Sequence, residues 1–194
     1  MSGQAGGASY GRQQIVVSGV GGQGVLFVTR LLADAAILRG GSVLTSETHG
    51  MAQRGGVVVS HLKAGDFASP LVRAGQADGL FALKEENLAL HRGFVKPGGW
   101  IVVNSARSCA AEGNEAIHAV DADGNAQETG NPQSVNLILL GFALSRLGTA
   151  DRGGLLFCSP DDVRAVLRQR LGERERVLFS AVAALELGIL RGKR

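Results

Sequence analysis

Two glycine-rich segments hold the residues best suited to bind an anion or to transfer a proton. The first has the pattern G-x-G-x-x-G at Gly19, Gly21 and Gly24, directly after the apolar run 15–17. Glycine permits a tight turn and lets backbone N–H groups approach a bound group closely. A helix that begins behind such a turn offers unpaired N–H groups, which attract an anion, usually a phosphate. The pattern therefore predicts an anion-binding loop, with a tight β–α turn that binds nothing as the alternative.

The second segment spans residues 46–56 and reads Ser-Glu-Thr-His-Gly-Met-Ala-Gln-Arg-Gly-Gly. Its Arg54 is suited to a bidentate contact with a carboxylate or a phosphate, although an ion pair with Glu47 is an alternative. His49 could move a proton near neutral pH, or it could be a structural histidine held by hydrogen bonds. We therefore treat Glu47, His49 and Arg54 as the candidates for a catalytic role.

The sequence predicts strands and helices in alternation on either side of these two segments. An apolar stripe from Val25 to Ala36 predicts a helix behind the first segment, and Gly40-Gly41 ends it as a C-cap would. A second strand over residues 42–46 would place the second segment at its carboxyl end. Because ligands bind at the carboxyl ends of the strands in open α/β sheets, we expect the two segments to share one edge.

The rest of the chain continues the alternation. Strands are expected over residues 57–62, 78–83, 100–104 and 117–120, with a turn at 96–99. Helices are expected over 85–92, 132–147 and 173–190, and another begins at Ser159 with a capping box. The helix over 132–147 is apolar on nearly all sides, so we expect it to be buried in the core or by a partner. The fold class is α/β and Rossmann-like, a mostly parallel sheet with helices on both faces. Residues 14–194 form one domain behind a disordered tail over 1–13.

Composition excludes several classes of protein. The chain has 194 residues, of which 45% are hydrophobic and 19% charged, which is typical of one globular domain. Two cysteines are too few for a disulfide framework or a four-thiolate cluster, and the four histidines lack metal-ligand spacing, so no metal site is expected. We find neither a signal peptide nor an apolar run that could cross a membrane, and we expect a cytoplasmic protein without a membrane partner.

The C-terminal part is basic, with ten Arg or Lys against six Asp or Glu from Arg146 onward. Nucleic-acid binding would need aromatic side chains among these basic residues, and only Phe157 and Phe179 are present there. The pattern favours a solvated helical surface and no nucleic-acid partner.

The two glycine-rich segments together resemble the gamma-type subunits of the 2-oxoacid:ferredoxin oxidoreductases. The form His-Gly-Met-Ala-Gln-Arg-Gly-Gly at residues 49–56 is most similar to the small (beta) subunits of the indolepyruvate-type enzymes. Ser69-Pro70-Leu71 and Gly130-Asn131-Pro132 also resemble that family. The resemblance covers residues 14–190, although the Arg-rich stretch from Ser145 onward matches nothing that can be carried over.

The resemblance implies a reaction in which a 2-oxoacid is oxidatively decarboxylated to an acyl-coenzyme A and electrons pass to ferredoxin. Thiamine diphosphate, magnesium and iron–sulfur clusters would lie on a larger partner subunit, because this chain has neither cluster cysteines nor a Gly-Asp-Gly…Asn thiamine signature. The isolated chain would then be inactive. Its expected partners are the large subunit and ferredoxin, with a homo-oligomer as a further possibility for the isolated chain.

Within that resemblance, backbone N–H groups for a carboxylate or for a phosphate, such as one of coenzyme A, would come from Gly19, Gly21, Gly22 and Gly24. Gln23 could add a side-chain donor, and Glu47 could contact a ribose or the thiamine, or accept from local N–H groups. Arg54 would hold the anion, while Gly55 and Gly56 would let the loop pass close to a partner.

Two other functions fit parts of the sequence. In a Rossmann-type protein that binds NAD, Glu47 would meet the ribose hydroxyls, since it lies about 20 residues past the glycines. That reading gives residues 47–56 no other function. A non-enzymatic assembly or regulatory module would instead dock through its apolar helix over 132–147.

Overall fold

The strands gather into one sheet, which the helices cover. The computed structural model describes residues 11–49 and 55–193. The strands are β1 (Gln13–Val20), β2 (Val43–His49), β3 (Val57–Ala64), β4 (Ala77–Ala82), β5 (Val95–Asn104) and β6 (Ala116–Val120). The α-helices are α1 (Val25–Leu38), α2 (Glu86–His91), α3 (Ala122–Glu128), α4 (Val135–Leu147), α5 (Pro160–Leu171) and α6 (Glu175–Gly192). Short 3₁₀ turns are η1 (Arg92–Phe94), η2 (Pro132–Ser134) and η3 (Ala150–Arg152).

One strand departs from a parallel arrangement. The described strands lie in the order β2-β3-β1-β4-β5-β6, and β1, β4, β5 and β6 run parallel. β3 pairs antiparallel with both β1 and β2, so the β2–β3 hairpin places β3 between β2 and β1. The expected α/β fold with a mostly parallel sheet is confirmed, and the strand beside β1 on this side is β3.

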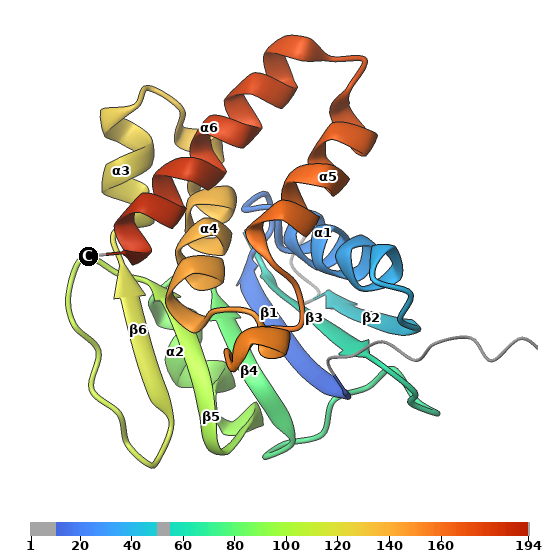
Figure 1. Cartoon of the computed structure of the whole chain (residues 1–194). Coiled ribbons are helices and arrows are strands. Elements are labelled where there is room, and N and C mark those ends of the chain that lie inside the picture. Colours follow the sequence, from blue (N-terminus) through green and yellow to red (C-terminus); the bar gives the residue numbers. More distant parts are fainter. Residues whose placement is uncertain (1–10, 50–54, 194) are drawn as a thin grey trace, which may run out of the picture.

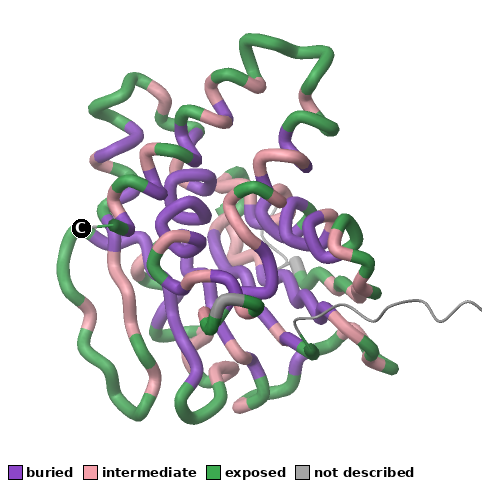
Figure 2. The backbone as a smooth tube through the Cα atoms, in the orientation of Figure 1, coloured by how far each residue is buried: buried purple, intermediate pink, exposed green. Residues whose placement is uncertain are grey.

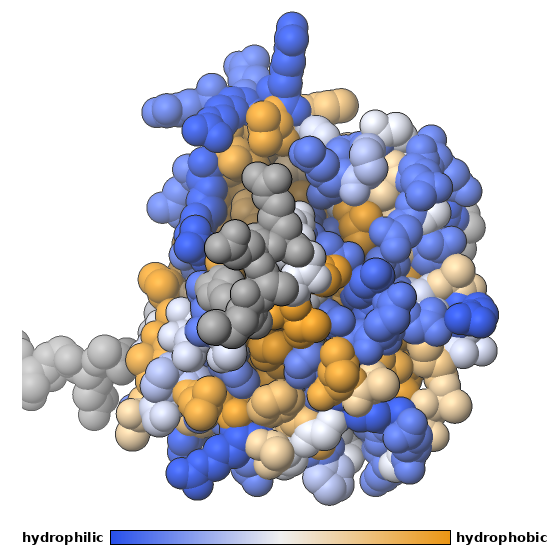
Figure 3. All heavy atoms as spheres, turned by 180° about the vertical axis from the view of Figure 1, so that it is seen from behind, coloured by the Kyte–Doolittle hydropathy of each residue, from blue (hydrophilic) through white to orange (hydrophobic). Residues whose placement is uncertain are grey.

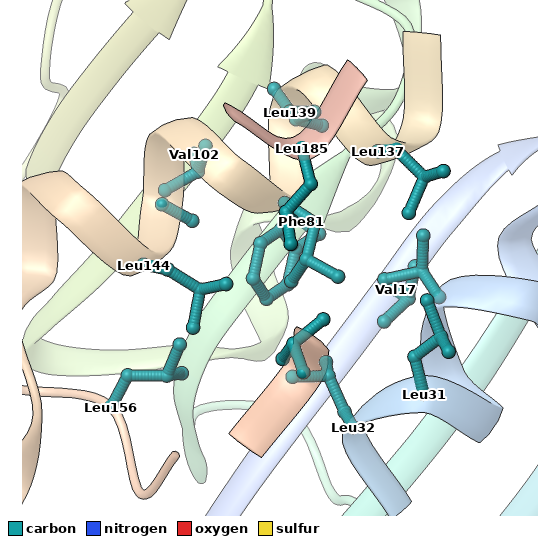
Figure 4. Close-up of a cluster of buried hydrophobic side chains, with 14 of the residues drawn as sticks. Val17, Leu31, Leu32, Phe81, Val102, Leu137, Leu139, Leu144, Leu156 and Leu185 are labelled. Carbon is teal, nitrogen blue, oxygen red and sulfur yellow. The ribbon is translucent and has the colours of Figure 1, made fainter. Parts of the chain in front are cut away.

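The sheet lies between two apolar clusters. Helices lie on both of its faces (Figure 1), and buried residues run along its central strands (Figure 2). The larger cluster lies on the side of α1, α4, α5 and α6, where Phe81 of β4 meets Leu32 of α1, Leu144 of α4 and Leu185 of α6 (Figure 4). The smaller cluster lies on the opposite side, where Leu88 of α2 packs on the sheet. Helices therefore cover both faces, as expected. None of the helices in the part of the chain that the structure describes could span a membrane.

The apolar helix α4 is buried along nearly its whole length, as its composition predicts. Its main neighbour is α6, and the two backbones touch. A Cβ atom on Gly141 would lie 2.1 Å from the Leu185 carbonyl oxygen, and one on Gly188 would lie 2.0 Å from the Ile138 carbonyl oxygen. These two glycines allow the close crossing. The chain thus buries α4 by itself, without a partner.

Several local expectations are wrong. The strand expected over 42–46 continues to His49, because the ladder with β3 persists to the pair His49 and Val58. The turn expected at 96–99 lies inside β5, where a register shift against β4 and the positive φ of Gly98 (75°) form a bulge. The helix expected over 132–147 begins as the 3₁₀ turn η2, and α4 follows it. The Asn131 side chain does not cap η2, because it donates to the Ser180 hydroxyl at 2.7 Å.

The start of helix α5 is as expected. Ser159 and Asp162 form the capping box at the start of α5. The helix α3 was not expected, and it begins with the Asp121 side chain accepting from the Gly124 N–H at 2.8 Å. Residues 1–10, most of the expected disordered tail, lie outside the described residues.

Candidate functional site

The first glycine-rich segment forms a closed turn between β1 and α1. The Gln23 N–H donates to the Val20 carbonyl oxygen at 3.0 Å, and the Gln23 side-chain oxygen accepts from the Val20 N–H at 2.8 Å. Gln23 therefore braces the loop with its side-chain carbonyl. The helix α1 begins directly after the loop, and its first N–H groups have no acceptor within the helix.

The physical reason for a glycine differs from position to position in this loop. A Cβ on Gly19 would lie 2.8 Å from Val25 Cγ2, so this position allows β1 to approach α1. Gly22 and Gly24 have positive φ angles of 96° and 81°, which side chains disfavour. Gly24 also faces the Asn136 side chain of α4, whose amide nitrogen would be 2.0 Å from an added Cβ. Gly21 is exposed, and a Cβ there would find no atom closer than 3.7 Å.

The two glycine-rich segments meet at one edge, as their positions along the sequence predict. The Gly21 N–H donates to the Gly56 carbonyl oxygen at 3.0 Å, and the Gly55 N–H lies against Gly21. This hydrogen bond occupies the Gly21 donor. An anion at this edge would then bind to the remaining N–H groups of the loop and to the first turn of α1.

A hollow of about 510 Å³ opens beside this loop. Two guanidinium groups line it together with Gly21, Gly22 and Gly24: Arg30 of α1 and Arg170 from the last turn of α5. Arg170 also pairs with Asp34 of α1, which raises the pKa of its guanidinium and keeps it charged. Two guanidinium groups beside a loop of backbone donors attract a phosphate or a carboxylate, although Asp34 offsets part of the charge of Arg170.

Neither arginine was a candidate from the sequence. Arg30 lies off the apolar stripe of α1, and this was the one available signal. Arg170 belongs to the basic C-terminal part, which the sequence assigned to solvent. Only the packing of α5 on α1 brings Arg170 to the loop.

The three catalytic candidates are placed only in part. Glu47 is exposed on β2, opposite Ser60 of β3. The backbone of His49 ends β2, and its side chain lies outside the described residues, as does Arg54. An ion pair between Glu47 and Arg54 is therefore untested.

The strand order disfavours the NAD interpretation. Dinucleotide binding needs an acidic residue at the end of the strand beside the glycine loop. Here β3 separates β2, and hence Glu47, from β1. The glycine loop and Glu47 do not form the expected ribose site.

A buried polar cluster on the opposite face has a packing role. His91 Nδ1 lies 2.9 Å from the Ser18 hydroxyl oxygen, and His61, 3% exposed, packs edge-on against Phe94. Burial lowers the pKa of both histidines, which favours their neutral forms. Ser18 is fully buried and His91 is half-buried, so the Ser18 hydroxyl is not open to solvent.

The two cysteines have no catalytic setting. Cys158 is buried, and that burial raises the pKa of its thiol, so it packs as a small apolar residue. Cys109 is half-buried. Over residues 11–49 and 55–193, no three or more His, Cys, Asp or Glu side chains gather in a way that could hold a metal ion.

Comparison with known proteins gives a consistent family match. Residues 14–190 match the family described as pyruvate ferredoxin/flavodoxin oxidoreductase. Indolepyruvate oxidoreductase subunit IorB of Pyrococcus horikoshii is 31% identical over 201 aligned positions, covering 92% of this chain and 95% of that protein. The protein of the same name from Archaeoglobus fulgidus is 42% identical over 96 residues, and that match spans about half of each chain (50% and 48%).

Two solved structures share the fold. The 2-oxoglutarate:ferredoxin oxidoreductase of Magnetococcus marinus, with 2-oxoglutarate, coenzyme A and succinyl-CoA bound, has a TM-score of 0.76 at 23% identity. That match covers 94% of this chain and 31% of the larger one. The gamma subunit of a keto/oxoacid ferredoxin oxidoreductase from Geobacter sulfurreducens has a TM-score of 0.73 at 24% identity, covering 93% of this chain and 98% of that one.

Proposed function

Because the chain belongs to the pyruvate ferredoxin/flavodoxin oxidoreductase family, we propose that it is the small subunit of a 2-oxoacid:ferredoxin oxidoreductase. The substrate is indolepyruvate or a related arylpyruvate, supported by the names of the relatives and by the segment at residues 49–56. The complex releases CO₂ from the 2-oxoacid, transfers the acyl group to the thiol of coenzyme A, and passes the electron pair to ferredoxin.

The redox and decarboxylation chemistry belongs to a larger partner subunit. Thiamine diphosphate supplies the carbanion chemistry, and iron–sulfur clusters carry the electrons. The residues of this chain do not fit an iron–sulfur cluster, since the sequence has two cysteines and Cys158 is buried. The sequence also lacks the Gly-Asp-Gly…Asn signature for thiamine diphosphate. Coenzyme A enters as a co-substrate, and no step of the reaction is assigned to a metal in this chain.

The observation that carries the proposal is the hydrogen bond between Gly21 and Gly56, which joins the two family motifs at one edge. The hollow beside that bond is lined by Arg30 and Arg170. This chain therefore contributes an anion-binding edge to the shared site, where it holds a phosphate of coenzyme A or the carboxylate of the 2-oxoacid. Arg54, in the same segment as Gly56, adds a further guanidinium.

The surface also supports a large protein partner. The α5–α6 hairpin projects from the body of the molecule (Figure 1), and its tip is hydrophilic with apolar side chains below it (Figure 3). On α6, Phe179 is 78% exposed and Val177 is 50% exposed. Exposed aromatic and aliphatic side chains on one helix are typical of a protein interface.

Co-purification tests this function. The chain carries an affinity tag, is expressed in its native host, and is isolated under anaerobic conditions. We expect a larger subunit with bound thiamine diphosphate and visible iron–sulfur absorbance, and ferredoxin reduction that depends on an arylpyruvate and coenzyme A. The chain purified alone should show none of these. Recovery as a lone chain that binds NAD, or with a partner that lacks thiamine, would contradict the proposal.

A further inference from the structure

A second positively charged hollow lies at the edge of the sheet opposite to the glycine loop. It opens where β1 begins and β3 ends, and it measures about 530 Å³. We call it the basic hollow, and its lining includes Arg12, Gln14, Lys63, Phe67, Ser69 and Arg73. It shares no lining residue with the hollow beside the glycine loop.

Lys63 is the central group of the basic hollow. The residue is 8% exposed, although a lysine is rarely buried without a partner. Its ammonium nitrogen lies 5.1 Å from the centre of the Phe67 ring, and the Arg12 guanidinium carbon lies 4.1 Å from the same centre. Two cations thus share one ring, whose negative face attracts both.

The backbone holds Arg12 at this place. Gly65, with a positive φ of 106°, packs against it, and a Cβ there would lie 3.1 Å from the Arg12 Cα. The Gly65 N–H donates to the Ser42 carbonyl oxygen at 2.8 Å, and the Ser42 hydroxyl donates back to the Gly65 carbonyl oxygen at 2.8 Å. The strand ends therefore fix the geometry of the basic hollow in the folded chain.

The three cationic side chains of the basic hollow are not paired with a carboxylate among the described residues. Asp78, which accepts from the backbone N–H of the lining residue Gln14 at 2.6 Å, pairs with Lys96 instead. Over residues 11–49 and 55–193, no ion pair with a carboxylate is formed by Arg12, Lys63 or Arg73. Residues 1–10 and 50–54 contain no Asp or Glu that could supply one. Burial, together with the positive charges of Arg73 and Arg12, lowers the pKa of Lys63. Like charges held together in this way are stabilised when an anion binds between them.

We propose that the basic hollow binds the phosphate group of a small anionic ligand, at a site separate from the glycine loop. Two guanidinium groups, one ammonium group and one hydroxyl line the hollow, and these are donors that proteins use for phosphate. The volume lies within the usual range of about 300–1,000 Å³ for small-molecule sites, so there is room for more than one phosphate. The proposal also gives a role to Ser69-Pro70-Leu71, since Ser69 and Leu71 line the hollow.

Binding of two phosphate probes to the full chain tests the proposal. Inorganic pyrophosphate and adenosine diphosphate are titrated separately, with calorimetry and phosphorus NMR as readouts, at low and at physiological salt. We expect saturable binding that weakens with salt, and at least a tenfold loss of affinity in Lys63→Gln and in Arg73→Gln. Equal affinity for both probes assigns recognition to the phosphates alone, and tighter binding of adenosine diphosphate extends the site to a nucleotide.

The controls separate this site from the glycine loop and from folding. Arg30→Gln should leave the affinity of the basic hollow unchanged, and so should Lys84→Gln, which alters an exposed lysine outside the hollow. Lys63→Gln should keep or raise the melting temperature, because it removes a buried charge beside two others. The proposal is overturned if neither probe binds, or if binding survives both Lys63→Gln and Arg73→Gln. Loss of binding only in Arg30→Gln would place the phosphate at the glycine loop instead.

Discussion

Replacing Gly24 by alanine is expected to destabilise the fold, because both the backbone conformation and the neighbouring side chain at this position disfavour a Cβ atom. Its φ of 81° lies in the left-handed region, and an alanine there costs about 1–2 kcal/mol. The added Cβ would also lie 2.0 Å from the Asn136 side-chain nitrogen, so that side chain must move. Asn136 accepts a hydrogen bond from the Leu137 N–H at 2.7 Å, and its loss costs about 0.5–1.5 kcal/mol.

The two terms together predict a loss of about 1.5–3.5 kcal/mol in the free energy of unfolding. For a domain of this size, 1 kcal/mol lowers the melting temperature by roughly 2–4 °C, so Gly24→Ala should melt roughly 3–14 °C lower. Urea unfolding and calorimetry measure both quantities. In the double variant Gly24→Ala/Asn136→Ala, the steric part should disappear, giving a favourable coupling of about 1 kcal/mol.

The matched control is Gly21→Ala in the same loop. Gly21 is not among the glycines with positive φ, and its Cβ would meet no atom closer than 3.7 Å, so the change should stay within about 0.5 kcal/mol. If Gly24→Ala unfolds at the same urea concentration as the wild type, the assigned role of Gly24 is refuted. Equal losses in both variants would also refute it, because they would mean that the loop does not distinguish its glycines.

Three other changes test further parts of the structure. Gly188→Ala should lower the free energy of unfolding by about 3 kcal/mol in calorimetry, because the added Cβ would press on the α4 backbone. Gly93→Ala is the control, since a Cβ there would lie in open space. An unchanged melting temperature for Gly188→Ala would count against the close crossing of α4 and α6. Burial lowers the pKa of His61 and His91 below 6.5, so the unfolded chain takes up protons first and stability should fall as the pH drops below about 6.5. Urea unfolding should show a weaker pH dependence in His61→Gln, and an identical dependence would exclude that histidine. Arg170→Gln should weaken binding of coenzyme A to the assembled complex at least fivefold in calorimetry, and unchanged affinity would remove Arg170 from the site.

Periodicity and glycine spacing predicted most elements, because local patterns determine local structure. The loop from β1 to α1 and the buried helix α4 follow directly from the residues that form them. The pairing of β3 with β1 could not be predicted in this way. It depends on which strands meet in space, and an apolar run such as residues 57–59 fits either strand direction.

The candidate site shows the same limit. The motif located the loop, but it did not reveal that Gly19 and Gly24 serve packing or that the Gly21 N–H is already bonded to Gly56. Arg30 and Arg170 lie 140 positions apart, so only tertiary packing brings them to one hollow. The sequence also does not show that Gly188 lies at a helix crossing. A glycine lowers the helix propensity of its segment, but its position does not say which helix packs against it.

We infer that the edge formed by the two glycine-rich segments completes the site of a larger oxidoreductase. The rate of indolepyruvate-dependent ferredoxin reduction by the reconstituted complex tests this role, with the wild-type chain, Gly21→Val or Arg54→Lys. Both variants should assemble and melt as the wild type does. Arg54→Lys should lose about 1–3 kcal/mol of transition-state stabilisation, the range for a charge-assisted hydrogen bond, and Gly21→Val should lose at least as much. Full activity of both variants in an intact complex would contradict the claim.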